Sequence, residues 1–202
     1  LEEKSREAAW WAADETRWSV FETTKTKTSF RWYLWVFLSE HSVVHVLDPS
    51  RATRVIAEHL GTVSDGILLV DRYSAYKSFA KDRAGITLAF CWSHVRRDFL
   101  DAGKSYEELF EWAEQWVARI NELFHRNGRR RKHRGGNNAF AHEDALLRKS
   151  VKQMREQAED ELSEKKLHQR RRHVLKSLLA HWDGLVVFVE HPEIPMDNNA
   201  SE

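Results

Sequence analysis

The chain is short of several features that would define a protein class by themselves. Its 202 residues include one cysteine, Cys91, so no internal disulfide can form, and we expect a reducing, cytoplasmic setting. The longest apolar run, residues 32–38, is far shorter than the roughly 20 residues that cross a bilayer. A signal-peptide pattern and an initiating Met are absent, which favours a piece of a longer protein.

Net charge is also almost absent. The 32 Lys and Arg residues against 31 Asp and Glu residues give a formal charge of +1, which predicts no partner of either sign. The distribution is uneven, because residues 104–182 hold 18 basic and 12 acidic residues and the remainder holds 14 and 19. The later segment therefore suits a polyanion, and the rest concentrates carboxylates.

Residues 1–103 show the alternating patterns of a mixed α/β domain. Aromatic and β-branched stretches with short polar links predict an antiparallel meander of three strands, followed by alternating helices and strands. The strands are expected at 8–20, 30–38, 42–47, 66–70 and 86–90, the links of the meander at 23–29 and 39–42, and the helices at 51–60, 74–81 and 93–100. The predicted order is β-β-β-α-β-α-β-α.

Residues 104–190 change character and predict a helical insertion. Apolar residues recur at three-to-four spacing from Tyr106 to Phe124 and again across 147–162 and 167–182. Residues 127–138 contain three glycines and no acid, which predicts a loop. Residues 191–202 predict the start of a last helix with a cap at 197–199, and because so little of that helix follows, we expect its residues to be displaced.

Two aspartates occupy matching places in the predicted sheet. Asp14 lies on the first strand and Asp71 directly follows the fourth, so a ribonuclease H-like sheet would bring them side by side. Paired carboxylates with little positive charge nearby suit Mg²⁺, which prefers oxygen ligands. The spacing leaves a second interpretation open, in which Asp14 is an exposed strand residue and Asp71 an N-cap for the next helix.

Six short motifs span nearly the whole chain. They are WAADETRW at 11–18, YLWV at 33–36, DPSR at 48–51, VDRYSAYK at 70–77, CWSHVRRDF at 91–99 and IPMDNNASE at 194–202. Together and in this order they closely resemble the catalytic core of the insertion sequence 66 family of bacterial transposases.

The resemblance implies a DDE-type transposase with a ribonuclease H-like fold. It implies that Asp14, Asp71 and Glu202 form the acidic triad that holds two Mg²⁺ or Mn²⁺ ions, and that a helical insertion separates the last two acids. The expected activity is cleavage of DNA at transposon ends and joining of the freed 3′-hydroxyl to target DNA, with a homodimer on paired ends. The expected division is a catalytic core at 1–103, an insertion at 104–190 and the start of the catalytic helix at 191–202.

Two other functions stay open. A structure-selective nuclease of the same fold would cut DNA without joining strands. A catalytically silent DNA-binding remnant would bind DNA without binding divalent metal. Glu15 and Asp197 are further acids that could support the site, although Asp197 is better explained as a cap.

The motif around Cys91 supplies further candidates. The family pattern places His94 near the edge of the active site, and Arg96 and Arg97 could contact DNA phosphates. Solvated helix-surface charge is the alternative for these two arginines. A zinc site is disfavoured, because Cys91 and His94 have no second pair of ligands at a suitable spacing, and we expect Cys91 to serve packing.

A cluster of basic residues lies within the predicted loop and its approach. It contains no acid, so its repulsion would be relieved by a DNA backbone or by solvent. DNA contact there would be independent of sequence and dependent on salt. The predicted DNA-binding residues are Arg129, Arg130, Arg131, Lys132 and Arg134, with a solvated loop as the alternative.

Overall fold

A computed structural model of the chain describes residues 2–21, 30–134 and 138–201. It divides into two compact units. Unit 1 is Leu1–Cys91 together with Asp197–Glu202, and unit 2 is Trp92–Met196. The division falls at Cys91 rather than at residue 103, because the helix that begins at Trp92 belongs with the later helices.

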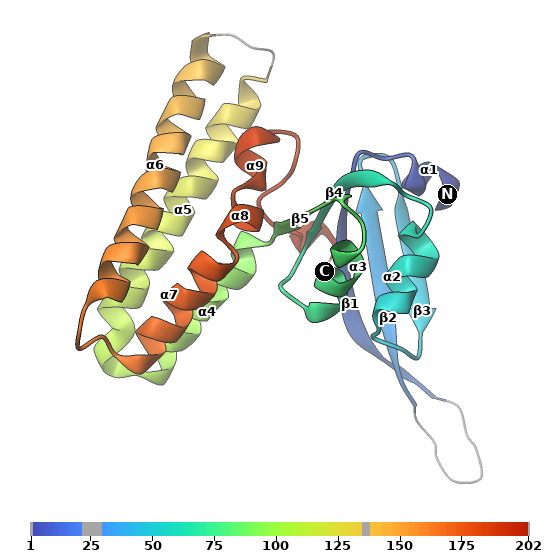
Figure 1. Cartoon of the computed structure of the whole chain (residues 1–202), viewed down its shortest axis with the longest axis horizontal. Coiled ribbons are helices and arrows are strands. Elements are labelled where there is room, and N and C mark those ends of the chain that lie inside the picture. Colours follow the sequence, from blue (N-terminus) through green and yellow to red (C-terminus); the bar gives the residue numbers. More distant parts are fainter. Residues whose placement is uncertain (1, 22–29, 135–137, 202) are drawn as a thin grey trace. The chain divides into compact units, whose positions relative to one another are not determined.

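Unit 1 has the predicted alternation of strands and helices (Figure 1). A short first helix, α1, precedes the meander, and a 3₁₀ turn, η2, follows unit 2 in the sequence. The elements are α1 (Glu2–Arg6), β1 (Trp10–Val20), β2 (Phe30–Ser39), β3 (Val43–Asp48), α2 (Thr53–Leu60), β4 (Asp65–Val70), α3 (Ser74–Lys81), β5 (Gly85–Phe90) and η2 (Asn199–Ser201). The predicted link at 23–29 lies outside the described residues.

The five strands form one mixed sheet in the order β3-β2-β1-β4-β5. The pairs β1–β2 and β2–β3 are antiparallel, which confirms the meander, and β1–β4 and β4–β5 are parallel. The short, wholly apolar end of β4 is buried, as expected for a central parallel strand. The mixed α/β class is therefore confirmed, and β1 stands at the junction of the antiparallel and parallel halves.

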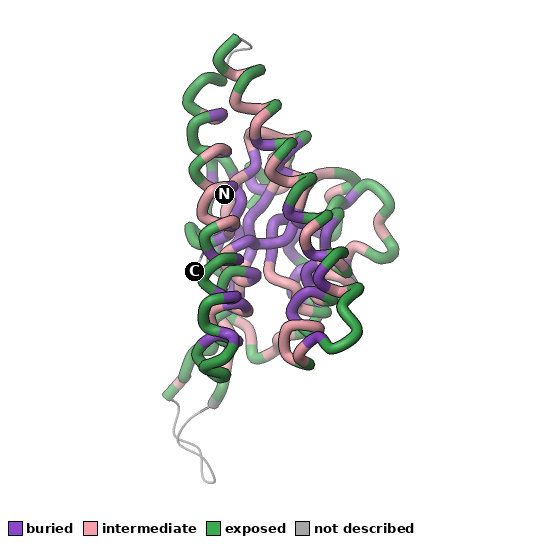
Figure 2. The backbone as a smooth tube through the Cα atoms, turned by 90° about the vertical axis from the view of Figure 1, so that its left-hand side faces the viewer, coloured by how far each residue is buried: buried purple, intermediate pink, exposed green. Residues whose placement is uncertain are grey.

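One face of the sheet carries the core of unit 1, beneath α2 and α3. Alternation along β1 and β2 directs Trp11, Ala13, Trp35 and Phe37 to this face, and all four are fully buried. The Trp35 ring meets that of Tyr76 on α3 at 6.1 Å between centroids. Figure 2 shows buried backbone gathered in the strands, whereas the long helices alternate between buried and exposed positions.

Gly66 is required where β4 begins. Its φ is +145°, a region that side-chain-bearing residues rarely adopt, and a Cβ there would lie 2.5 Å from the ring of Trp11. A larger residue would therefore displace the core tryptophan beside the parallel pair.

Unit 2 is built from helices in its described part. They are α4 (Trp92–Ser105), η1 (Glu107–Leu109), α5 (Phe110–Lys132), α6 (Asn138–Ser163), α7 (Gln169–Ala180), α8 (Trp182–Leu185) and α9 (Val187–Glu190). The rings of Phe99 on α4 and Trp116 on α5 stack at 5.0 Å, and both side chains are fully buried. The predicted amphipathic helices are confirmed, with their apolar stripes turned into a shared core.

The loop predicted at 127–138 is wrong over its first half. Helix α5 continues through Lys132, and residues 135–137 lie outside the described part. Charge and glycine content indicated a loop, but tertiary partners of Arg130, described below, stabilise the helical conformation.

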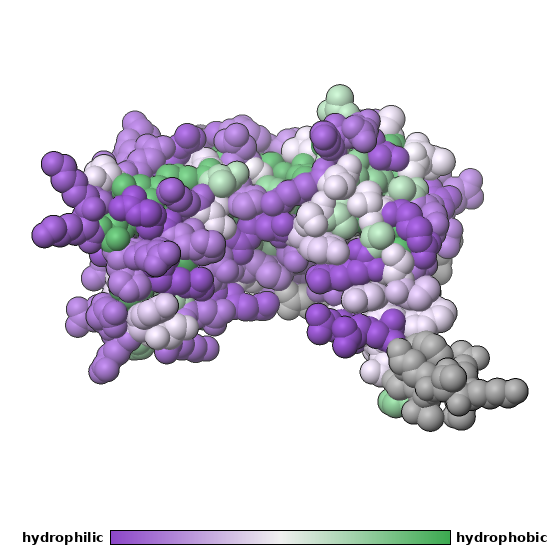
Figure 3. Space-filling model, turned by 60° about the horizontal axis from the view of Figure 1, so that its bottom comes forward, coloured by the Kyte–Doolittle hydropathy of each residue, from purple (hydrophilic) through white to green (hydrophobic). Residues whose placement is uncertain are grey.

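Hydrophilic side chains cover most of the surface that Figure 3 shows, and hydrophobic ones form smaller patches between them. No helix in the described part of the chain is long and apolar enough to cross a membrane.

Candidate functional site

Asp14 lies on β1, and Asp71 directly follows β4, the parallel neighbour of β1. The β1–β4 ladder pairs Trp10 with Ile67 and continues to Ala12 with Leu69. Each aspartate lies two residues beyond that last pair. If the register continued unchanged, the two residues would be opposite one another and would point to the same face of the sheet.

Asp71 also shapes the turn that leads into α3. Its Oδ1 accepts a hydrogen bond of 2.8 Å from the backbone N–H of Tyr73, and α3 begins at Ser74. Asp71 is thus two residues before the cap position, which is held by Tyr73 without a side-chain bond. The interpretation of Asp71 as the N-cap is wrong, because the carboxylate stabilises a turn that precedes the helix.

Glu15 lies on the opposite face of β1 from Asp14, beneath α2 and α3. Its side chain is 1% exposed. Tyr76 Oη donates a hydrogen bond of 2.5 Å to Oε2, and the Arg51 guanidinium approaches Oε1 with Nε at 2.7 Å and Nη2 at 2.6 Å. Both carboxylate oxygens are therefore bonded, as a buried acid requires.

Arg51 links this acid to the Asp71 turn. Its guanidinium carbon lies 4.1 Å from the centroid of the Tyr73 ring, and Tyr73 Oη donates a hydrogen bond of 3.1 Å to the carbonyl oxygen of Arg51. The Tyr73 and Tyr76 rings meet edge to face at 6.4 Å. We call Glu15, Arg51, Tyr73 and Tyr76 the Glu15 cluster.

The carboxylates of the site affect one another electrostatically. Burial raises the pKa of Glu15, the hydrogen bonds from Tyr76 and Arg51 oppose that rise, and the charge of Asp71 adds to it. Burial also raises the pKa of Tyr76 well above its ordinary value, with further contributions from Glu15, Asp14 and Asp71. The charges of all three acids thus raise the pKa of the Tyr76 hydroxyl.

Two cations lie near Asp71. Burial lowers the pKa of Lys77, Arg72 lowers it further, and the charge of Asp71 opposes both. Lys77 lies on α3, and Arg72 directly follows Asp71 in the sequence. The candidate site therefore has positive charge beside its carboxylates.

Residues 197–201, which follow unit 2 in the sequence, lie against β1, the strand that carries Asp14, and against its neighbour β2. Asn198 is fully buried, and its Nδ2 donates a hydrogen bond of 3.1 Å to the carbonyl oxygen of Ala13. Ser201 is buried, and Asp197 Oδ1 accepts a bond of 3.2 Å from the N–H of Asn199, the first residue of the 3₁₀ turn η2. The expectation of a displaced segment is wrong for residues 198–201, because Asn198 fastens it to β1. Glu202 lies outside the described residues.

The donor set at Asp14 and Asp71 fits a hard divalent cation. Mg²⁺ is held by one or two carboxylates and completes its shell with waters and substrate phosphates. Within residues 2–21, 30–134 and 138–201 no group of three His, Cys, Asp or Glu side chains is placed to hold a metal ion. Asp14 and Asp71 are therefore two candidate ligands, and they do not by themselves make up a complete metal site.

The chain was compared with known proteins. The model of the transposase IS66 family matches residues 1–202. The chain belongs to this transposase family. It is 38% identical over 104 residues to the uncharacterized protein y4qI of Sinorhizobium fredii (strain NBRC 101917 / NGR234), covering 44% of this chain and 19% of that protein. It is 29% identical over 171 residues to the uncharacterized protein y4jD of the same strain, covering 80% of this chain and 32% of that protein.

The resemblance stated from the six motifs is thus confirmed at the level of the family. The matched region spans about a fifth to a third of the length of these two curated relatives. No solved structure matches the chain.

The other predicted site residues of this transposase-family chain lie on unit 2. Arg96 and Arg97 are exposed on α4, and His94 precedes them with a buried Nδ1 that has no hydrogen-bond partner in the described structure. Cys91 is buried at the end of unit 1, as the packing interpretation predicted. The roles of His94, Arg96 and Arg97 stay predictions.

The basic cluster at the end of α5 has acidic partners that its local sequence lacks. Arg129 Nε lies 3.1 Å from Glu143 Oε2, and Arg134 Nη2 lies 3.9 Å from Glu193 Oε2. The expectation that this cluster has no acid to pair with is therefore wrong. Arg131, Lys132 and the partly paired Arg129 and Arg134 remain candidates for phosphate contact.

Arg130 does not fit the predicted DNA contact, because its side chain is fully buried. Its guanidinium donates to Asp144 Oδ1 at 2.7 Å and to the carbonyl oxygens of Phe188 at 2.6 Å and Val189 at 2.9 Å. A further bond of 2.9 Å reaches Asn127 Oδ1. This arginine joins α5, α6 and α9, and its burial leaves no surface for contact with a DNA phosphate.

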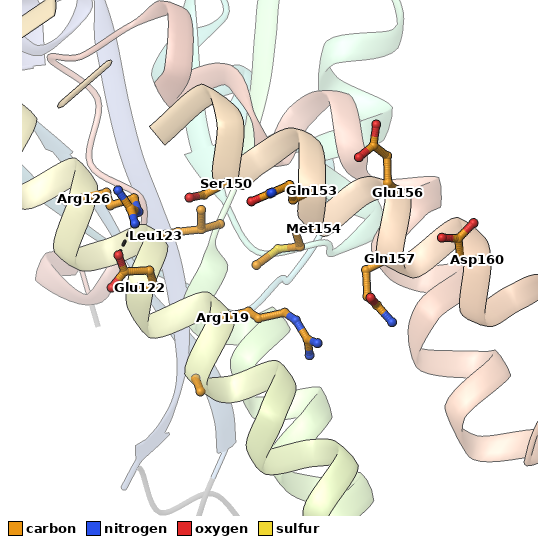
Figure 4. A pocket seen from close by; sticks show the side chains of 11 residues that line it. Arg119, Glu122, Leu123, Arg126, Ser150, Gln153, Met154, Glu156, Gln157 and Asp160 are labelled. Atoms are coloured by element: carbon orange, nitrogen blue, oxygen red, sulfur yellow. Dashed lines mark ion pairs between the residues drawn. The ribbon is translucent and has the colours of Figure 1, made fainter. Parts of the chain in front are cut away.

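A groove of about 690 Å³ runs between α5 and α6 (Figure 4). Arg119 extends toward it, and Arg126 forms an ion pair of 2.8 Å with Glu122 at its wall. Glu156 and Asp160 on α6 add acidic charge, so the lining is mixed in sign and does not select an anion.

Sequence reasoning missed most of the Glu15 cluster. Glu15 was noted as a possible supporting acid, but its partners Arg51 and Tyr76 were not proposed. A signal was present in the motifs DPSR and VDRYSAYK, which hold Arg51, Tyr73 and Tyr76. Their mutual contact depends on the packing of α2 and α3 on the sheet.

Proposed function

We propose that this chain is the catalytic region of a DDE-type transposase with a ribonuclease H-like fold. The observation that carries the proposal is that Asp14 on β1 and Asp71 just after β4 each lie two residues beyond the last pair of the parallel β1–β4 ladder. The sheet order β3-β2-β1-β4-β5 and the alternation of strands and helices support the fold assignment. Family membership supports DNA as the substrate and partner.

Asp14 and Asp71 would hold Mg²⁺ or Mn²⁺ through their carboxylate oxygens, with Glu202 as the proposed third ligand. A bound pair of such ions activates the attacking oxygen and stabilises the leaving oxygen in phosphodiester chemistry. The acids themselves act as ligands, and the attacking group is a water in hydrolysis and the freed DNA 3′-hydroxyl in strand transfer. Pairing of two transposon ends by a homodimer stays a prediction.

Cations of unit 1 would offset the phosphate charge. Lys77 and Arg72 lie in the electrostatic range of Asp71 and belong to the same βα junction. We include them among the proposed phosphate contacts, because both are cations close to Asp71.

Mn²⁺ titration of the 202-residue chain tests the metal site. Asp14→Asn and Asp71→Asn should each weaken Mn²⁺ binding at least tenfold, because each removes a charged ligand. Asp65→Asn is the matched control, since Asp65 begins the same strand that Asp71 follows and lies at its opposite end. Equal Mn²⁺ affinity in all four proteins would contradict the proposal.

A second assay separates the proposed enzyme from the alternatives. The parent protein that contains this region should cleave labelled transposon ends and join them to target DNA, and both reactions should disappear with Asp14→Asn or Asp71→Asn. Cleavage without joining would identify a nuclease of the same fold. DNA binding without Mn²⁺ binding would identify a silent remnant.

A further inference from the structure

The β1–β4 ladder stops short of the two aspartates. Its last pair joins Ala12 and Leu69, two residues before Asp14 and Asp71. Strand hydrogen bonds fix the spacing of the backbones only up to that pair. Additional contacts must therefore hold Asp71, which lies in a turn, at a constant position relative to Asp14.

The Glu15 cluster supplies contacts on both sides of this gap. Glu15 is covalently next to Asp14, and its carboxylate is fixed by Arg51 and Tyr76. Arg51 in turn stacks on Tyr73, whose N–H is bonded to Asp71 Oδ1. One continuous set of contacts thus runs from the neighbour of Asp14 to the carboxylate of Asp71.

The chemistry of the cluster also favours positioning over simple stabilisation. Removing the Glu15 carboxylate from water is costly, while the Arg51 side chain stays 37% exposed. Directional bonds to both oxygens of Glu15, however, fix the carboxylate in one orientation. The cluster therefore provides geometry that an apolar core would not.

We propose that Glu15 is a positioning residue that, through Arg51 and Tyr76, sets the placement of Asp14 relative to Asp71. This inference rests on the proposed function, because it concerns the same pair of acids. Glu15 points to the other face of the sheet and does not itself bind the metal. Partners that orient metal ligands typically change metal affinity by about 10–100-fold when they are removed.

The direction in which Arg51→Gln changes Mn²⁺ affinity separates a positioning role from a purely electrostatic effect. Arg51→Gln removes a cation near Asp71, so a pure charge effect would tighten Mn²⁺ binding. Positioning predicts the opposite, a loss of about tenfold. Tyr76→Phe keeps every charge and removes one hydroxyl, and we expect it to weaken Mn²⁺ binding as well and to change the electron paramagnetic resonance spectrum of the ion that remains bound.

Two control variants of the 202-residue chain match these changes. Arg54→Gln removes a half-exposed arginine of the same unit that pairs with Asp48 and Glu58, outside the cluster. Glu161→Gln perturbs a buried glutamate of unit 2. Both should leave Mn²⁺ affinity within about twofold of the unmodified chain. Circular dichroism at the titration temperature verifies that each variant is folded.

The outcomes are distinct. Weaker binding in Arg51→Gln and Tyr76→Phe, with both controls unchanged, supports the positioning role. Tighter or unchanged binding in Arg51→Gln overturns it, while Asp14→Asn still decides whether the metal site exists. Unchanged Mn²⁺ binding in Asp14→Asn overturns the metal site and the positioning role together.

Discussion

Each unit buries a glutamate, and the two carboxylates have different surroundings. In unit 2, Glu161 accepts hydrogen bonds from the indole N–H of Trp112 at 2.7 Å and of Trp116 at 3.1 Å, and from Arg171 at 3.0 Å. In unit 1, Glu15 accepts hydrogen bonds from Tyr76 and Arg51. Asp14 and Asp71 lie close enough that their charges, like that of Glu15, act on Tyr76.

The pKa values move in opposite directions. Burial raises the pKa of Glu161, but the bonds from Trp112, Arg171 and Gln157 outweigh it, and the pKa ends below its ordinary value. Burial dominates at Glu15, where Asp71 adds to the rise. Hydrogen bonds therefore outweigh burial at Glu161, whereas burial outweighs them at Glu15, with Asp71 as a minor contribution.

The largest expected effect concerns the buried cation of unit 2. Arg130→Leu should lower the free energy of unfolding by about 3–5 kcal/mol, because two buried carbonyl groups lose their charged donor and Asp144 keeps only Arg148 as a partner. Urea unfolding followed at 222 nm measures the loss. Arg155→Gln, which breaks an exposed pair on α6, should leave the midpoint nearly unchanged. A small effect of Arg130→Leu would mean that Arg148 compensates for the lost partner of Asp144.

Glu161→Gln should destabilise unit 2 by about 1–3 kcal/mol, because Arg171 and the indole donors lose a charged acceptor. The pH dependence sharpens the comparison. Since the folded-state pKa of Glu161 lies below its ordinary value of 4.5, its stabilising contribution is complete above that value and is lost as pH falls through the lower pKa. Acid unfolding of Glu161→Gln should therefore depend less steeply on pH. An equal slope would show that other carboxylates dominate.

The next prediction concerns the basic residues at the end of α5 and their proposed contact with DNA. Neutralising Arg129, Arg131 and Lys132 to Gln should weaken binding to unrelated DNA sequences equally. The log–log salt slope should fall by about 0.9 per lost phosphate contact. A matched control neutralises Lys149, Lys152 and Arg155 on α6, which removes the same charge elsewhere in unit 2. Equal loss in both variants would indicate a general charge effect rather than a contact at this cluster.

The smallest expected effect is a pH dependence in unit 1. Burial and the charge of Arg6 lower the pKa of His59, which contacts Ser5 Oγ at 3.2 Å, while Glu2 opposes the shift. The neutral ring is therefore favoured in the folded state, and stability should fall as pH decreases from about 6.5 through the lower pKa. Urea unfolding between pH 7.5 and pH 5 should show this loss for the unmodified chain. His59→Gln should remove it, and a persistent loss would implicate another group.

Local pattern was sufficient to predict most of the fold. The alternation in β1 and β2 and the apolar end of β4 can be recognised in the sequence. Successive strand residues point to opposite faces of the sheet, so the polarity of each residue indicates which face is buried. The matching places of Asp14 and Asp71 followed from the element order. Family motifs supplied Glu202, for which no local pattern exists.

Long-range contacts were not predictable in the same way. Arg130 appeared to belong to an unpaired loop, because its partners Phe188 and Val189 lie 58 and 59 residues away. Glu15 meets Arg51 and Tyr76 at separations of 36 and 61 residues. The motifs single out Arg51 and Tyr76 as residues, but a single sequence does not indicate that they pair with Glu15, since only the packed helices bring them together.

The discontinuity of unit 1 has a consequence for the order in which the chain folds. The chain leaves unit 1 after Cys91 and returns to it at Asp197. Asn198 therefore cannot reach Ala13 until all of unit 2 has been synthesised. An unstructured connection of that length would carry a large entropic cost of closure. Trp92 N–H donates a hydrogen bond of 2.9 Å to the carbonyl oxygen of Met196, which holds the first and last residues of unit 2 together. Prior folding of unit 2 would thus shorten the connection, and the pairing of Asn198 with β1 would be a late event that awaits the helices.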